Sequence, residues 1–140
     1  MAELSTMTPA VTTVLASAEA CERVSALPGA CAISLGEVAI VGDASITALR
    51  QAVERIDPDA VVRDVSEGWA MHTIWGGGAR EAFARLSELE LPASGFVQGA
   101  VARIGVRVLV DGDRVDLLVP SMLAAHLRER IEDECGDLLR

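Results

Sequence analysis

A tight turn between two alternating segments is the feature that most constrains how this chain can fold. Asp111 and Gly112 separate residues 106–110, which are mostly valine and leucine, from residues 114–119, in which every second residue is apolar. Asp-Gly pairs tolerate the positive φ that short hairpin turns require. The sequence therefore predicts a β-hairpin here, with one apolar side on its returning strand.

Four further segments have the pattern of strands. Residues 37–41 and 61–65 are apolar and largely β-branched, and residues 97–104 run up to a break at Gly105. Residues 69–75 alternate: Trp69, Met71, Thr73 and Trp75 are expected on one face, and Ala70, His72 and Ile74 on the other.

Three helices are predicted between and after these strands. Asp43 is expected to cap the first, which has apolar residues at helical spacing over 46–56 and ends at Asp57-Pro58. The second follows Gly76-Gly77-Gly78 over 79–86, and the third has its apolar stripe over 123–131. The order β-α-β-β-α-β-β-β-α predicts an α+β fold, in which helices cover mainly one face of a mixed β-sheet.

The chain is predicted to consist of an arm and one domain. Residues 1–29 are rich in Ser, Thr and Ala and are expected to be a flexible N-terminal arm, with a short helix near residues 14–24. Residues 30–140 are long enough to form a single α+β domain with its own core.

Charge and cysteine content restrict the partners and the compartment. The net charge is -9 and all twelve basic residues are arginine, so nucleic acid and anionic membranes are disfavoured and lysine chemistry is excluded. The absence of lysine indicates a GC-rich bacterial genome. The three cysteines show no CxxC spacing and favour reduced thiols. With no basic leader and no apolar stretch of about 20 residues, a cytoplasmic location is expected.

No residue pattern indicates catalysis or metal binding. The triple glycine lacks the lysine of a phosphate loop, and we interpret it as a strand-to-helix turn. His72 and His126 have no recognisable nucleophile motif beside them, and Asp64 and Glu67 are interpreted as solvated loop charges. Cys31 is expected to be a small core residue and Cys135 to be partly exposed.

Large aromatic side chains are the strongest candidates for function. Trp69 and Trp75 are expected on one strand face, where they either pack in the core or contact another protein. Tryptophan is enriched at binding hot spots. We therefore take Trp69, Trp75 and Phe96 as candidate interface residues.

Four motifs resemble the gamma subunits of heterotetrameric sarcosine oxidase. Residues 63–69 (RDVSEGW) resemble their D-[VL]-S-[DH]-[GR], and residues 75–86 (WGGGAREAFARL) resemble a turn and helix of the form S-G-P-x-A-R-x-[LV]-L-A-x. Residues 96–99 (FVQG) are similar to F-x-x-G, and residues 113–121 (DRVDLLVPS) to D-x-F-x-L-x-V-x-R-S. The resemblance extends over residues 36–131. It departs from the family at Gly77, which stands where a proline is usual.

The resemblance implies a non-catalytic accessory subunit. In that family the larger subunits carry flavin, NAD, folate and the substrate, whereas the gamma subunit binds no cofactor and packs against the large subunit. The resemblance also implies the fold of the folate-binding domain of aminomethyltransferases. Two alternatives stay open: a stand-alone folate-binding one-carbon domain, and a homo-oligomeric scaffold that binds no small ligand.

Overall fold

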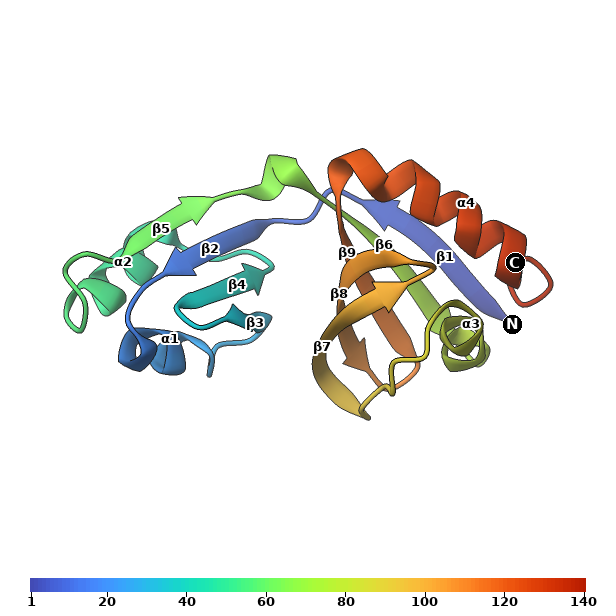
Figure 1. The fold of residues 1–140 in the computed structure, drawn as a ribbon, viewed down its shortest axis with the longest axis horizontal. Coiled ribbons are helices and arrows are strands. Elements are labelled where there is room, and N and C mark those ends of the chain that lie inside the picture. The colour runs from blue at the N-terminus through green and yellow to red at the C-terminus, as the bar shows by residue number, and fades with distance from the viewer. The chain divides into compact units, whose positions relative to one another are not determined.

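The computed structural model describes residues 1–140, which divide into two compact units (Figure 1). Unit 1 comprises Met1–Thr8 and Glu67–Arg140, and unit 2 is the intervening Pro9–Ser66. Each unit has an antiparallel sheet and two helices, so the predicted α+β class is confirmed. The single mixed sheet is replaced by two wholly antiparallel ones, and residues 30–140 belong to two units.

Unit 2 has the β-α-β-β-α-β order of ferredoxin-like domains. Its strands lie in the order β3-β4-β2-β5, and every neighbouring pair is antiparallel. Its elements are β2 (Val11–Leu15), α1 (Ala18–Val24), β3 (Ala30–Ser34), β4 (Glu37–Val41), α2 (Ile46–Glu54) and β5 (Val61–Asp64).

Both helices of unit 2 pack on one face of its sheet. The core there is small and aliphatic: Val14, Ala20, Cys21, Val24, Val38, Ile40, Leu49, Val53 and Val62. Serines cap both helices, since the Oγ atom of Ser17 accepts from the N–H of Ala20 and that of Ser45 from the N–H of Ala48. The predicted cap at Asp43 is therefore wrong: α2 begins after Ser45.

Unit 1 is built on a sheet of order β1-β6-β9-β8-β7. Its elements are β1 (Ala2–Met7), β6 (Trp69–Gly76), α3 (Ala79–Leu86), β7 (Ser94–Val101), β8 (Ile104–Asp111), β9 (Arg114–Pro120) and α4 (Ala124–Cys135), with 3-10 turns η1 (Ser66–Gly68) at the unit boundary and η2 (Ser121–Leu123). The predicted hairpin forms, because Asp111 pairs with Arg114 across a turn in which Gly112 has a φ of 57°. None of the helices has the length and apolar content that a bilayer crossing needs.

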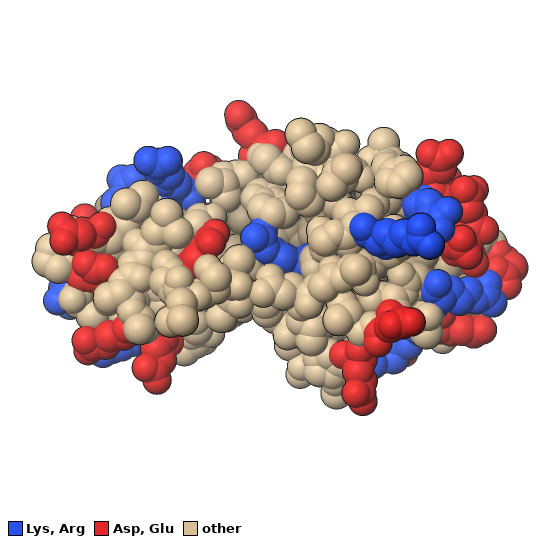
Figure 2. All heavy atoms as spheres, viewed as in Figure 1, with Lys and Arg blue, Asp and Glu red and all other residues tan.

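Helices α3 and α4 cover one face of this sheet. Phe83 from α3 and Leu127 and Ile131 from α4 are fully buried or nearly so. They pack with the inward residues of the strands, among them Ile74, Val106, Val108, Val115, Leu117 and Val119. Along α4, Arg128 pairs with Glu132 and Arg130 pairs with Glu134. Figure 2 shows positive and negative side chains mixed near the C-terminus.

The first 29 residues are structured, which corrects the expectation of a flexible arm. β1 pairs along its whole length with β6, and β2 lies between β4 and β5. Ala2 is fully buried, and its N–H donates to the carbonyl of Leu138 at 2.8 Å. A local pattern rich in Ser and Thr cannot show such pairing, because the partner strands lie far along the chain.

Candidate interaction site

The sheet of unit 1 has a second face, opposite α3 and α4, which we call the helix-free face. On β6, Ile74 contacts the helix-side core, so Trp69, Met71, Thr73 and Trp75 point the other way, as the alternation predicted. Directly paired residues of antiparallel strands share a face. The register therefore adds the following residues to the helix-free face: Ser94, Phe96, Gln98, Arg107, Leu109, Asp111, Arg114, Asp116, Leu118 and Pro120.

The three candidate interface residues all lie on this face. Phe96 pairs with Leu109 on β8 and is half-buried. Trp69 is half-buried, and Trp75 is 36% exposed near the end of β6. Sequence alternation alone places two of them together; the third is brought to the same face by strand pairing. Their role in binding a partner stays a prediction.

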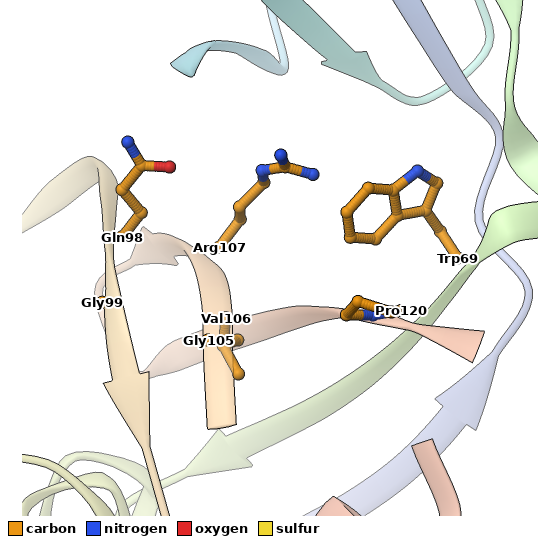
Figure 3. Close-up of a pocket in the computed structure, with 7 residues that line it drawn as sticks. All are labelled: Trp69, Gln98, Gly99, Gly105, Val106, Arg107 and Pro120. Atoms are coloured by element: carbon orange, nitrogen blue, oxygen red, sulfur yellow. The ribbon is translucent and has the colours of Figure 1, made fainter. Parts of the chain in front are cut away.

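A hollow of about 400 Å³ lies at one end of the helix-free face (Figure 3). It is lined by Trp69, Gln98, Gly99, Gly105, Val106, Arg107 and Pro120. Figure 3 shows the side chains of Trp69, Gln98 and Arg107 standing on the same side of the sheet. The space beside Gly105 is open, since a Cβ atom there would have no atom within 4 Å.

Arg107 is the residue of this site that sequence reasoning missed. Its guanidinium carbon lies 4.3 Å from the centre of the Trp69 ring, in a cation–π contact. The only local signal is a charged residue between valines in a strand. That pattern indicates an outward position for the side chain but does not identify Trp69 as its neighbour. Trp69 comes from β6 and Arg107 from β8, with β9 between them.

Asp116, towards the other end of the face, already has partners. The carboxylate of Asp116 accepts a hydrogen bond from the Thr73 hydroxyl at 2.7 Å and pairs with Nε of Arg114 at 3.1 Å. The charge of Asp116 is therefore balanced by a neighbouring residue of the same face, whereas no ion pair is formed by Arg107 in the hollow.

His72 lies on the opposite, helix-side face and is 1% exposed. Its Nε2 atom is 2.7 Å from the carbonyl of Ala124, which can only accept, so Nε2 carries the proton. Nδ1 then accepts from the hydroxyl of Thr6 at 2.7 Å, and that oxygen accepts from Arg128. Burial lowers the pKa of His72 below its ordinary value. The neutral imidazole ring thus links β6 to β1 and α4 by hydrogen bonds.

The other residues singled out by the sequence have structural surroundings. The glycine turn before α3 packs against β1: a Cβ atom on Gly76 would lie 2.9 Å from the carbonyl oxygen of Met1, which explains its small size. Cys31 is fully buried, as expected. Cys135 is buried too, which corrects the prediction of partial exposure, and burial raises its pKa. No group of His, Cys, Asp or Glu has the arrangement to hold a metal ion.

Solved structures with the same fold are known. No protein-family model matches the chain, and no curated protein matches it either. A chain of the heterotetrameric sarcosine oxidase from Corynebacterium sp. U-96, solved with pyrrole 2-carboxylate, superposes with a TM-score of 0.81 at 12% identity; the match covers 97% of this chain and 84% of that one. The fold is that of a sarcosine oxidase chain. Because coverage is high on both sides, the two chains are also similar in length.

Aspartate kinases give weaker matches. The Synechocystis enzyme aligns with a TM-score of 0.51 at 13% identity, over 95% of this chain but 26% of the kinase. The regulatory subunit of aspartate kinase from Thermus thermophilus aligns with a TM-score of 0.50 at 11% identity, over 94% of this chain and 96% of that one. At these identities the matches concern the fold alone.

Proposed function

We propose that this protein is an accessory subunit of a sarcosine oxidase-type amine oxidase or dehydrogenase, comparable to the gamma subunit. The observation that carries the proposal is the 0.81 TM-score over nearly the whole of both chains. A shared domain inside a larger enzyme would leave much of that enzyme uncovered, whereas here 84% of one chain of a multi-subunit enzyme is matched. Both units of the present chain take part in the match, since 97% of it is covered.

The helix-free face supports a binding role for this subunit. It carries two tryptophans, a phenylalanine and two arginines, residue types that are enriched at interfaces. In the proposed complex the larger subunits carry the flavin, NAD and folate, and this chain contributes contact surface. The N-methylated amino acid substrate would be bound by those subunits as well.

The test is reconstitution of the complex. The chain is co-expressed with the genes that flank its own and purified through a tag on the neighbouring subunit. The molar mass of the product is then measured by size-exclusion chromatography with light scattering. We expect it to co-elute in fixed stoichiometry with larger flavin-containing subunits. Migration on its own at 14.7 kDa would contradict the proposal. Saturable heat on titration with tetrahydrofolate would instead favour the stand-alone one-carbon domain.

A ligand-binding regulatory module is the second candidate. Unit 2 has a hollow of about 380 Å³ beside the start of α2, lined by Leu27, Pro28, Ile40, Asp43, Ala44, Ser45, Ala48, Leu49 and Ala52. The structural similarity to the regulatory subunit of Thermus thermophilus aspartate kinase extends over 94% of this chain. A thermal shift with a panel of free amino acids tests it: a rise in Tm with one amino acid would support this function.

A further inference from the structure

Arg107 differs from the other half-buried arginines of this chain. Arg80 donates to the backbone carbonyls of Pro92 and Gly112, Arg128 pairs with Glu132, and Arg130 pairs with Glu134. Arg107 is buried to a similar degree, and its guanidinium stacks on the ring of Trp69 through its flat face. No carboxylate forms an ion pair with it. Its nitrogen atoms are not buried without a partner, so a ligand that enters the hollow can reach them.

The stack on Trp69 leaves the edge of the guanidinium available. A cation–π contact uses the flat face of the group, while the five N–H donors lie in its plane. The indole also restricts the side chain, so less conformational entropy is lost when a ligand binds. The planar fork matches a carboxylate, which it can bind through two parallel hydrogen bonds.

The surroundings of Arg107 are apolar rather than acidic. Pro120 and Val106 line the same hollow, and Leu118, directly across from Arg107 on β9, is fully buried. A site of this kind suits an anionic group carried on an apolar body. A flat, charged surface would be expected for a freely hydrated ion instead.

We propose that the hollow between Trp69 and Arg107 receives an acidic side chain of the larger oxidase subunit, flanked by apolar residues that cover Trp69 and Pro120. The inference rests on the proposed function and names the contact by which this subunit docks. The unpaired cation sets the chemistry of the partner, and the aromatic wall gives contact area around it.

The test uses the reconstituted complex and its dissociation constant, measured by calorimetry. Removing one side of a desolvated, hydrogen-bonded ion pair weakens binding by about 30-fold or more, so Arg107→Ala is expected to reach that loss. Arg107→Lys keeps the charge but not the planar fork and should recover part of the affinity. Arg103→Ala removes an exposed arginine from the β7–β8 turn of the same sheet and serves as the matched control.

The outcomes separate the two hypotheses. If wild-type chain forms no complex, the proposed function fails and this contact with it. If the complex forms and Arg107→Ala binds within about threefold of wild type, the contact fails alone. Two results would assign the hollow to another occupant: a homodimer of the free chain that Arg107→Ala breaks, or quenching of tryptophan fluorescence by acetate that saturates. Should Arg107→Ala fold poorly by circular dichroism, Arg107→Gln, which keeps a polar stem without the charge, takes its place.

Discussion

The buried His72 ties three elements of unit 1 together, and its replacement tests whether that tie stabilises the fold. His72→Ala removes two hydrogen bonds, to Thr6 and to the carbonyl of Ala124. Each is worth about 1 kcal/mol net, and leaving the partly buried carbonyl of Ala124 without this donor costs up to about 1–3 kcal/mol more. The ring is 1% exposed, so its loss also leaves a cavity. We expect the free energy of unfolding to fall by about 3–5 kcal/mol.

Urea unfolding followed by tryptophan fluorescence measures this change, because Trp69 and Trp75 both lie in unit 1. His126→Ala is the control, since that histidine is exposed on α4 and its loss should change the free energy of unfolding little. A loss below about 1 kcal/mol for His72→Ala would refute the reasoning, because it would mean that the hydrogen bonds and the packing of the ring contribute no net stability.

The same histidine gives a pH dependence with a defined sign. Burial lowers the pKa of His72 in the folded chain, so the unfolded chain binds the proton more readily. The stabilisation is complete above the unfolded pKa of about 6.5 and declines as the pH falls below it, until the folded pKa is reached. One proton gives a slope of at most about 1.4 kcal/mol per pH unit. Urea midpoints at pH 7.5 and 5.5 should diverge in wild type and converge in His72→Ala; an equal divergence in both would contradict this origin.

Three further outcomes follow from local geometry. Ser45→Ala should lower the stability of unit 2 by about 1 kcal/mol, because the cap of α2 is lost, whereas Asp43→Ala should leave the urea midpoint nearly unchanged. Gly29→Ala should prevent stable folding, seen as a loss of Tm or of soluble yield, because φ is 76° there and a Cβ atom would lie 2.1 Å from a carbonyl oxygen of β4. The hydrogen bond from Arg85 lowers the pKa of Asp137, so NMR titration should find it below 3.8 in wild type and closer to that value in Arg85→Ala.

Elements with a strong local pattern were predictable from the sequence. The hairpin of β8 and β9 carries its own turn signal, and α2, α3 and α4 each show an apolar stripe at helical spacing. The break between β7 and β8 was predicted at Gly105 but lies at Ala102 and Arg103, which have φ values of 49° and 68°. A residue other than glycine in this conformation is uncommon, and nothing in the local sequence marks it.

Strands that depend on distant partners were not predictable in this way. β1 is exposed over much of its length, and it forms a strand because β6 lies beside it. β2 has three buried positions among five, yet its neighbours β4 and β5 follow more than twenty residues later. In such cases the pairing supplies the stabilisation, and propensity alone is a weak guide.

The division into two sheets explains why the class was right and the architecture was not. Helices were expected to cover mainly one face of a sheet, and that arrangement fits a single sheet and equally two smaller ones. The distinction depends on where the chain leaves one sheet and joins the other, at Thr8–Pro9 and Ser66–Glu67. The local sequence does not mark those junctions. They become visible only through the pairing of β1 with β6, the two strands on either side of unit 2 in the sequence. The pairing of β6 with β9, and of β9 with β8, places Trp69 and Arg107 on one face with a single strand between them. Alternation within one strand could predict the face of Trp69 but not its neighbour from β8, so the candidate site is a product of tertiary pairing.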